Sequence, residues 1–278
     1  METRFKEVLT EDVQGRSDTR GVALDKVGVC DLKLPLKLKG CERNSKRSQH
    51  VQAVIDMSVD LGPLQKGVHM SRLVETVLDH YDEISLNNME SFLSDICKRQ
   101  GAYRSYAKIE FDYFFEREAP VSGKTSPQAY RCFYQGEYSK SGVEIIQGVE
   151  VPVKTLCPCS KEISDYGAHN QRSKVWITLT HSFPVKAQKI QISLEEIIEI
   201  AENGASSPLY PILKREDERF VTMSAYDKPC FVEDVVRNIA VQLKGDKRFD
   251  SYQLKVINYE SIHSHNAFAL IEKRRIDN

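Results

Sequence analysis

Apolar and polar residues alternate along several stretches of the chain, and a period of two is typical of half-buried β-strands. In the first half this alternation predicts two strands at 32–38 and 51–61. It predicts two further strands at 107–115 and 130–134. The first half therefore holds two pairs of strands separated by about 45 residues, enough chain for helices between the pairs.

Between the two pairs, apolar residues recur at spacings of three and four, which predicts two amphipathic helices. Leu73 and Val77 lie on one face of the first helix, and Phe92 and Ile96 on one face of the second. Gly101 follows the last apolar position and is typical of a helix C-terminus. The order in this half is strand, strand, helix, helix, strand, strand.

The second half repeats this order of elements without detectable sequence identity to the first. Ser193 followed by Glu196 has the spacing of a helix N-terminal capping box. The elements are strands at 143–153 and 174–180, helices at 193–204 and 231–243, and strands at 251–260 and 267–273.

These patterns predict an α+β fold built from two tandem β-β-α-α-β-β modules, with antiparallel sheets and helices on one face. The boundary is predicted in the Ser-Lys-Ser-Gly segment, which gives a first module at 1–140, with an N-terminal extension, and a second at 141–278. The second module has an insertion at 205–229 between its helices. Segments of this length inside a compact domain are functional or disordered, and its mixture of charged and apolar residues favours an ordered, functional segment.

Composition narrows the class of protein. The chain has 278 residues, 41% of them hydrophobic and 28% charged, and its mean hydropathy of -0.43 is typical of a soluble globular protein. Its formal net charge of -1 provides no global attraction for nucleic acid or for a membrane surface, so an anionic substrate requires a local basic pocket. We expect neither a signal peptide nor a membrane span. Seven scattered cysteines favour a reducing compartment, so we expect a cytoplasmic protein.

The segment 155–172 carries the strongest chemical signal. Cys157 and Cys159 flank a proline, and His169 follows twelve residues after Cys157. Thiolate and imidazole groups are preferred ligands of zinc and similar divalent ions, and the lack of a second cysteine pair favours an open three-ligand site. The residues alone leave the third ligand open and leave two interpretations, a metal-assisted hydrolase or a thiol enzyme acting on a polar substrate. The candidates for the third ligand are Glu218, Glu260, His263 and His265.

A single histidine is more often a hydrogen-bonded structural residue than a metal ligand. Here, however, two histidines and a glutamate lie within six residues near the C-terminus. An extended chain would place His263 and His265 on the same face of a strand. Their clustering makes a role in the site as probable as a structural one.

Five separated segments resemble the GTP cyclohydrolase IB family, in the family's order and over nearly the whole chain. Three carry the proposed chemistry: GVEVPVKTLCPCSKEISDYGAHNQR, KREDERFVTMSAYDKPCFVEDVVR and YESIHSHNAFALIE. The other two are DVQGRSDTRGVALDKVGV and QKGVHMSR near the N-terminus. Lys154, Glu216 and Asn266 depart from the family pattern, where threonine, proline and aspartate are more usual, and none of them is assigned to chemistry.

This resemblance implies a tunnelling fold assembled as a homotetramer, with active sites at subunit interfaces. It implies conversion of GTP and water to 7,8-dihydroneopterin triphosphate and formate, the first step of folate and related pterin biosynthesis. A divalent metal ion, namely zinc, manganese or iron(II), would be bound by Cys157, His169 and Glu218. The interpretation requires no nucleic acid and no membrane.

The resemblance also assigns roles to other residues. Cys159 would be a second thiol facing the substrate, and Glu233 would anchor guanine by accepting two parallel hydrogen bonds. Glu260, His263 and His265 would transfer protons or orient other groups. For the triphosphate, cationic and polar groups near the first helix and in the second module are candidates. These are Lys66, His69, Ser71, Arg72, Lys161 and Arg172.

Three other functions compete with this one. A tunnelling-fold nitrile reductase would act through Cys159 and would need NADPH but no metal. A non-catalytic purine-binding protein would not be expected to keep the full set of candidate residues. A structural zinc protein would unfold when its metal is removed.

Overall fold

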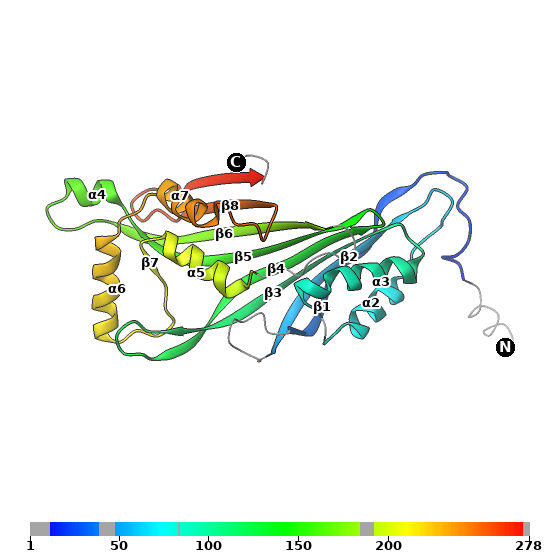
Figure 1. Ribbon diagram of the computed structural model, residues 1–278, viewed down its shortest axis with the longest axis horizontal. Coiled ribbons are helices and arrows are strands. Elements are labelled where there is room, and N and C mark those ends of the chain that lie inside the picture. The colour runs from blue at the N-terminus through cyan, green and yellow to red at the C-terminus, as the bar shows by residue number, and fades with distance from the viewer. Residues whose placement is uncertain (1–11, 39–47, 83, 184–191, 275–278) are drawn as a thin grey trace.

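The computed structural model describes residues 12–38, 48–82, 84–183 and 192–274. Strands and helices are arranged as Figure 1 shows. The strands are β1 (Leu24–Leu38), β2 (Gln49–Leu61), β3 (Arg104–Glu118), β4 (Thr125–Ser139), β5 (Gly142–Leu156), β6 (Asn170–Phe183), β7 (Ser207–Pro208), β8 (Ser251–Asn258) and β9 (Ala267–Arg274). The helices are α2 (Met70–Asp79), α3 (Met89–Gln100), α4 (Pro158–Ile163), α5 (Leu194–Gly204), α6 (Arg215–Asp227) and α7 (Val232–Leu243), with a 3₁₀ turn at Leu86–Asn88.

The described strands form one antiparallel sheet that runs through both halves of the chain. Its order is β1-β2-β3-β4-β5-β6-β8-β9, and the short β7 pairs with β5. The two halves meet at the β4–β5 hairpin, where Ser139 pairs with Gly142 across a two-residue turn. The sheet therefore crosses the expected module boundary without a break, and Figure 1 shows the long, twisted ribbon that results.

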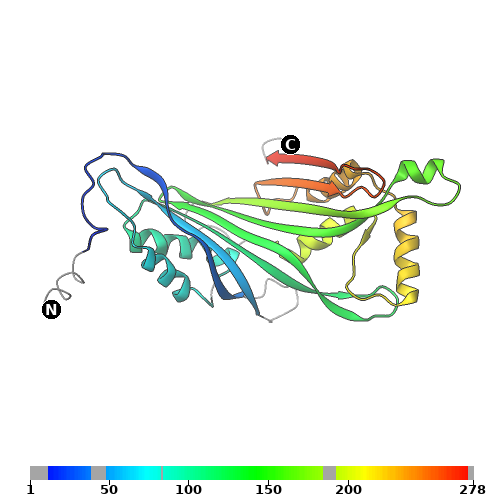
Figure 2. The ribbon, with the colours of Figure 1, turned by 180° about the vertical axis from the view of Figure 1, so that it is seen from behind.

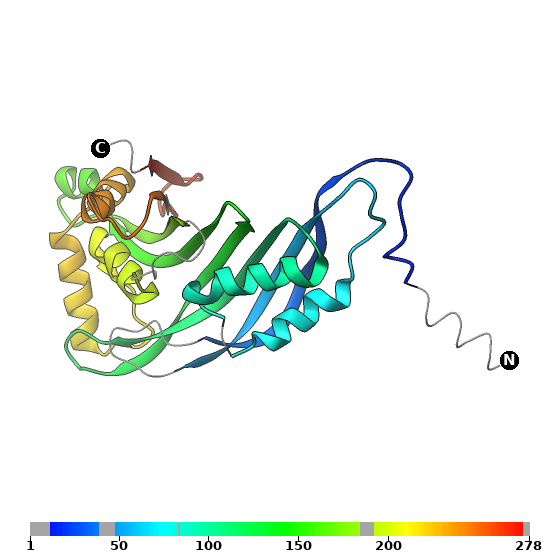
Figure 3. The same cartoon turned by 45° about the vertical axis from the view of Figure 1, so that its right-hand side comes forward.

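Helices α2, α3, α5 and α7 lie on one face of this sheet, whereas α4 and α6 lie at its end, as Figure 3 shows. The reason is side-chain alternation: Cys132 on β4 pairs with Val149 on β5, which in turn pairs with Ile177 on β6, and all three are buried. Helices α2 and α3 cover the first-half strands of this face, and α5 and α7 cover the second-half strands. The opposite face carries polar and charged side chains such as Lys108 and Glu150.

Two glycines allow the helices to lie close to their neighbours. A Cβ on Gly136 of β4 would lie 2.6 Å from Leu93 Cδ1 of α3, and one on Gly204 of α5 would lie 2.5 Å from Ile239 Cγ1 of α7. Gly101 has a φ of 64° and ends α3 in the left-handed conformation, as its position in the sequence predicts.

Most elements follow the sequence prediction, including an antiparallel α+β fold with helices on one face. The expected N-cap is confirmed, because Ser193 Oγ accepts a hydrogen bond from the Glu196 backbone N–H at 3.2 Å. The predicted strand at 251–260 is two residues too long, since β8 ends at Asn258. The insertion at 205–229 is ordered and contains β7 and helix α6, which the apolar spacing did not reveal.

None of the described helices is long and apolar enough to cross a membrane.

Replacing Gly204 with alanine tests the close approach of α5 and α7. Alanine favours a helix by up to about 1 kcal/mol over glycine, whereas overpacking a filled core costs about 1–3 kcal/mol. Because Ile239 is fully buried, we expect Gly204→Ala to lower the free energy of unfolding by about 1 kcal/mol in urea titrations. Glu199→Ala, at an exposed position of the same helix, is the control. A stabilised Gly204→Ala protein would contradict this packing.

Candidate functional site

Cys157 and His169 lie opposite each other where β5 ends and β6 begins. Leu156 pairs with Asn170, and immediately beyond this pair the Cys157 backbone N–H donates to the His169 carbonyl at 3.1 Å. Cys157 is also the N-cap of α4, and its Sγ accepts a hydrogen bond from Ser160 N at 3.4 Å. Directly opposed residues on antiparallel strands have Cβ atoms about 5 Å apart. The fold therefore brings a thiol and an imidazole side by side from twelve residues apart.

A chain of hydrogen bonds runs from His169 across the buried face of β5, β6 and β8. His169 Nδ1 lies 3.0 Å from Gln171 Oε1, and Gln171 Nε2 donates to Thr155 Oγ1 at 3.1 Å. Thr155 Oγ1 lies 2.8 Å from Ser173 Oγ, which donates to Asn258 Oδ1 at 2.7 Å. Thr155, Gln171, Ser173 and Asn258 are all buried. Asn258 is the last residue of β8, and the loop that carries Glu260 follows it.

The direction of this chain determines the tautomer of His169. Ser173 uses its hydroxyl hydrogen on Asn258, so it accepts from Thr155, and Thr155 in turn accepts from the Gln171 amide nitrogen. The amide oxygen of Gln171 is left facing His169, where it accepts a hydrogen bond from Nδ1–H. The lone pair of His169 then lies on Nε2, one of the two ring nitrogens through which a neutral histidine binds a metal ion.

Glu218 lies apart from this pair. It is exposed in the first turns of α6, whereas Lys161 of α4 contacts the other end of that helix, donating from Nζ to the Tyr226 carbonyl at 2.5 Å. Tyr226 is eight positions beyond Glu218 in the helix, a distance of about 12 Å along the axis. Within the described parts of the chain, no three His, Cys, Asp or Glu side chains are grouped closely enough to hold a metal ion.

Glu233 lies at the N-terminus of α7, close to the end of β5. The Cys230 N–H donates to the Leu156 carbonyl at 3.0 Å and holds the start of this helix next to Cys157. Asp234, not Glu233, makes the capping bond by accepting from Phe231 N–H at 3.0 Å. The exposed carboxylate of Glu233 therefore lies at the same end of the sheet as Cys157 and His169.

The loop between β8 and β9 carries Glu260, His263 and His265. The Tyr259 N–H donates to the Arg172 carbonyl at 3.0 Å, so this loop starts beside β6, and Figure 2 shows it next to α4. The condition for placing both histidines on one face of a strand is not met, because the chain bends after Asn258. The bend nevertheless stacks the rings of His263 and His265, with centroids 5.2 Å apart and planes inclined by 15°. Both rings are exposed and Glu260 is half-buried.

The polar groups on the helix-free face include one cation that the sequence analysis did not select. Lys154 pairs in register with Arg172, so both side chains leave the same face of the sheet. Partial burial lowers the pKa of Lys154 from its ordinary value. Neighbouring lysine and arginine side chains provide a local positive charge for an anion. Cys159 is exposed on α4 of the same region.

The candidate triphosphate residues near α2 lie at the far end of the molecule. Figure 1 shows α2 at the opposite end of the sheet from α4 and α6. Lys66, Ser71 and Arg72 are exposed, whereas His69 is half-buried and its Nε2 lies 3.3 Å from Asp12 Oδ2. A single chain therefore does not bring these groups to the Cys157–His169 pair.

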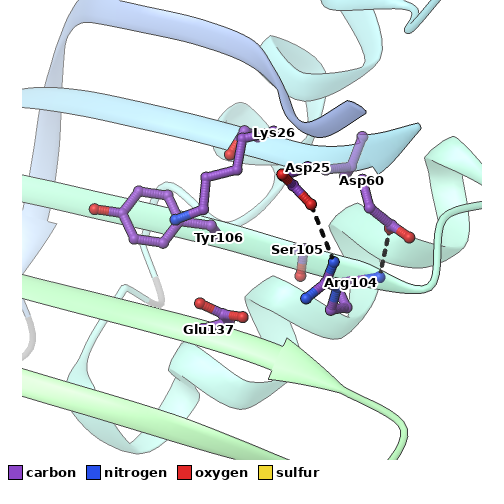
Figure 4. A pocket seen from close by; sticks show the side chains of 9 residues that line it. Asp25, Lys26, Asp60, Arg104, Ser105, Tyr106 and Glu137 are labelled. Atoms are coloured by element: carbon purple, nitrogen blue, oxygen red, sulfur yellow. Dashed lines mark hydrogen bonds and ion pairs between the residues drawn. The ribbon is translucent and has the colours of Figure 1, made fainter. Parts of the chain in front are cut away.

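A small pocket in the first half does not coincide with any predicted site. Its volume is about 150 Å³ (Figure 4), far below the 300–1,000 Å³ or so of typical ligand pockets. Its charges are largely compensated: Arg104 lies 3.8 Å from Asp25, and Lys26 Nζ lies 3.6 Å from the centre of the Tyr106 ring. Asp60 accepts hydrogen bonds from two backbone N–H groups.

Comparison with known proteins identifies the family. The sequence model for type I GTP cyclohydrolase folE2 matches residues 10–269. This chain belongs to that family. The GTP cyclohydrolase FolE2 of Thermotoga maritima is 48% identical over 263 residues, covering 95% of this chain and 97% of the relative. That of Methylobacillus flagellatus is 45% identical over 264 residues, covering 95% of each chain.

Solved structures of urate oxidases resemble this chain in fold alone. Urate oxidase from Bacillus subtilis 168 has a TM-score of 0.52 at 10% identity, covering 91% of this chain and all of the other. A hyperthermostable urate oxidase from Bacillus sp. TB-90 has a TM-score of 0.52 at 11% identity, covering 92% and 100%. This likeness is consistent with the tunnelling fold that the sequence resemblance implies.

The tautomer of His169 is a direct test of the buried hydrogen-bond chain. We expect ¹⁵N NMR of the metal-free protein at neutral pH to show protonation at Nδ1 of His169. Gln171→Ala removes the acceptor and should produce a mixture of both tautomers. Gln253→Ala, which removes an exposed amide on β8, should leave the spectrum of His169 unchanged. Protonation at Nε2 in the unaltered protein would show that the chain runs in the other direction.

Proposed function

We propose that this FolE2-family protein is a GTP cyclohydrolase of the IB class, which opens the imidazole ring of guanine in GTP. The products are 7,8-dihydroneopterin triphosphate and formate, in the first step of folate and pterin biosynthesis. The observation that carries the proposal is 48% identity to GTP cyclohydrolase FolE2 over 95% of the chain. The adjacent Cys157 and His169 supply the chemistry that such a reaction needs.

The donor set fits a divalent metal ion. A thiolate and an imidazole with its lone pair on Nε2 suit zinc, manganese or iron(II), and Glu218 would complete three protein ligands. When bound, such an ion activates water as a nucleophile at neutral pH. Because Glu218 lies away from the pair within one chain, its approach requires either a movement of α6 or a second chain.

The substrate would lie across subunits of a homotetramer. Glu233 would bind guanine by accepting from N1–H and the 2-amino group, a pattern that adenine does not present. Lys66, His69, Ser71 and Arg72 would bind the triphosphate. Their distance from Cys157 in one chain supports a site built from two subunits, with α2 of one chain facing the β5–β6 end of another (Figure 1). Lys161 and Arg172 would add positive charge from the second chain.

Proton transfers would fall to groups around the same end of the sheet. Cys159 is exposed on α4 and would face the opening ring. His263 and His265 are stacked in the same exposed loop, so either ring would be placed to give or take a proton. Glu260, half-buried beside them, would hold or relay that proton.

The two-module architecture is part of this proposal. The order β1-β2-α2-α3-β3-β4 has a counterpart in β5-β6-α5-α7-β8-β9, with α4, β7 and α6 as additions. Each set has helices between two pairs of strands and covers the same face of the sheet. A division near residue 140 follows, with the second module carrying most of the proposed chemistry.

The function is tested by incubating purified, metal-analysed protein with GTP and Mn²⁺. We expect release of formate and, after oxidation, fluorescence of a neopterin product. Cys157→Ala and treatment with a chelator should each abolish both signals, because each removes part of the metal site. No formate from metal-loaded protein would contradict the proposal. Reduction of a nitrile substrate with NADPH that survives chelation would favour the thiol-dependent reductase instead.

Arg72→Ala tests the proposed triphosphate contact. A hydrogen bond to a charged group contributes about 1.5–3 kcal/mol, so the KM for GTP should rise about tenfold or more. The content of bound metal should not change, since Arg72 lies at the other end of the chain. Arg99→Ala removes an equal charge from the neighbouring helix and should have a smaller effect. An unchanged KM for Arg72→Ala would exclude it from the site.

A further inference from the structure

The tip of the β3–β4 hairpin is bonded to the first turn of α6 through one buried carboxylate. Asp217 Oδ1 accepts hydrogen bonds from the backbone N–H groups of Val121 and Ser122, both at 2.8 Å. Its Oδ2 accepts from Ser122 Oγ at 2.6 Å and from the Lys214 N–H at 2.8 Å. The side chain is fully buried. Figure 3 shows the hairpin reaching α6 at the end of the sheet.

The bond to Lys214 caps the helix, but the three bonds to the hairpin go beyond capping. Asp234 occupies the same position in α7 and caps it through Phe231 N–H, yet its side chain remains 40% exposed. A carboxylate removed from water requires several strong donors to offset its lost hydration. The hairpin, about 95 residues away in the sequence, supplies those donors to Asp217.

The hairpin tip is shaped to present these donors. Ala119 N–H donates to the Lys124 carbonyl at 2.9 Å and Gly123 N–H to the Ala119 carbonyl at 3.1 Å, which close the turn. Gly123 has a φ of 65°, a conformation that glycine adopts readily. This turn points the N–H groups of Val121 and Ser122 together at Asp217.

Apart from the hairpin, α6 is held by a small buried apolar contact and by Lys161 at its last turn. Besides Asp217, only Val221 and Ala225 are buried among the residues of α6, and Phe220 and Met223 are each 48% exposed. The hydrogen bonds of Asp217 to the hairpin act on the first turn of α6, where Glu218 N–H donates to the Lys214 carbonyl at 2.9 Å. Because neighbouring helix residues differ in direction by about 100°, fixing Asp217 inward sets the direction of Glu218.

We propose that Asp217 is a positioning residue, which holds α6 against the β3–β4 hairpin and thereby sets the direction in which Glu218 faces the metal bound by Cys157 and His169 of a neighbouring chain. This inference rests on the proposed role of Glu218 as a ligand. It makes the first half of the chain part of the metal site, although none of the proposed ligands belongs to that half.

The test measures Mn²⁺ affinity by equilibrium dialysis for Asp217→Ala, Glu218→Ala and the double variant, with circular dichroism to verify folding. We expect Asp217→Ala to weaken Mn²⁺ binding by about 10–100-fold, the usual effect of losing a residue that orients a ligand. The double variant should bind no more weakly than Glu218→Ala, because Asp217 acts through Glu218. Asp60→Asn alters a carboxylate that also accepts two backbone N–H bonds, and it should retain full affinity.

Ser122→Ala provides a milder version of the same change. It removes one hydrogen bond to Asp217 from outside the helix and leaves α6 unaltered, so a severalfold loss of Mn²⁺ affinity is expected even if Asp217→Ala fails to fold. The inference is overturned if both variants bind Mn²⁺ like the unaltered protein, or if the losses in the double variant multiply. The inference is also overturned if Glu218→Ala binds Mn²⁺ with the affinity of the unaltered protein. Formate release by the unaltered protein separates each of these results from a failure of the proposed function.

Discussion

Antiparallel pairing between β4 and β5 carries one side-chain alternation from the first half of the chain into the second. Gly136 opposes Ile145 and Cys132 opposes Val149, so the apolar positions of both halves fall on one face. A slip of one residue at this hairpin would turn every second-half apolar side chain to the other face. All covering helices are consequently on one side, and the other side remains polar.

That arrangement separates the side chains that are candidates for catalysis and binding. The thiol, imidazole and acidic groups gather where β5, β6 and β8 reach one end of the sheet, while the cations of α2 lie at the opposite end (Figure 1). A long sheet with a bare face cannot fold back to bring its own ends together, because the strands are stiff over their whole length. A substrate that needs both sets of groups therefore favours assembly of several chains.

The regular elements were readable from the sequence because their periods reflect burial. Strands such as β2 alternate cleanly, with Val51, Ala53 and Ile55 buried and their neighbours more exposed. Helix α6 was missed for the converse reason: it leaves Phe220 and Met223 exposed, so its apolar residues form no continuous stripe. The spacing of Lys214 and Asp217 was the available signal, since an acidic residue three positions after a helix start is typical of a capped N-terminus.

Only part of the candidate site could be predicted from the sequence. Residue type and spacing make Cys157 and His169 candidate metal ligands, but their adjacency depends on the β5–β6 register. Gln171 and Asp217 were not selected from the sequence, because side-chain hydrogen bonds such as theirs leave no periodic trace. In the structure Gln171 orients the imidazole on the buried face of the sheet, and Asp217 holds the helix that carries Glu218.

The hydrogen bonds around Gln171 and those around Asp217 differ in stiffness, in a way that suits an open metal site. The Gln171–Thr155–Ser173–Asn258 chain is buried under three strands, where apolar residues would pack as well and avoid the cost of dehydrating hydroxyls and amides. Such a fully satisfied network instead gives a unique orientation, because each donor has one acceptor. Cys157 and His169 are thus fixed by the sheet. Glu218, by contrast, lies on a largely exposed helix that Asp217 holds at its first turn and Lys161 at its last.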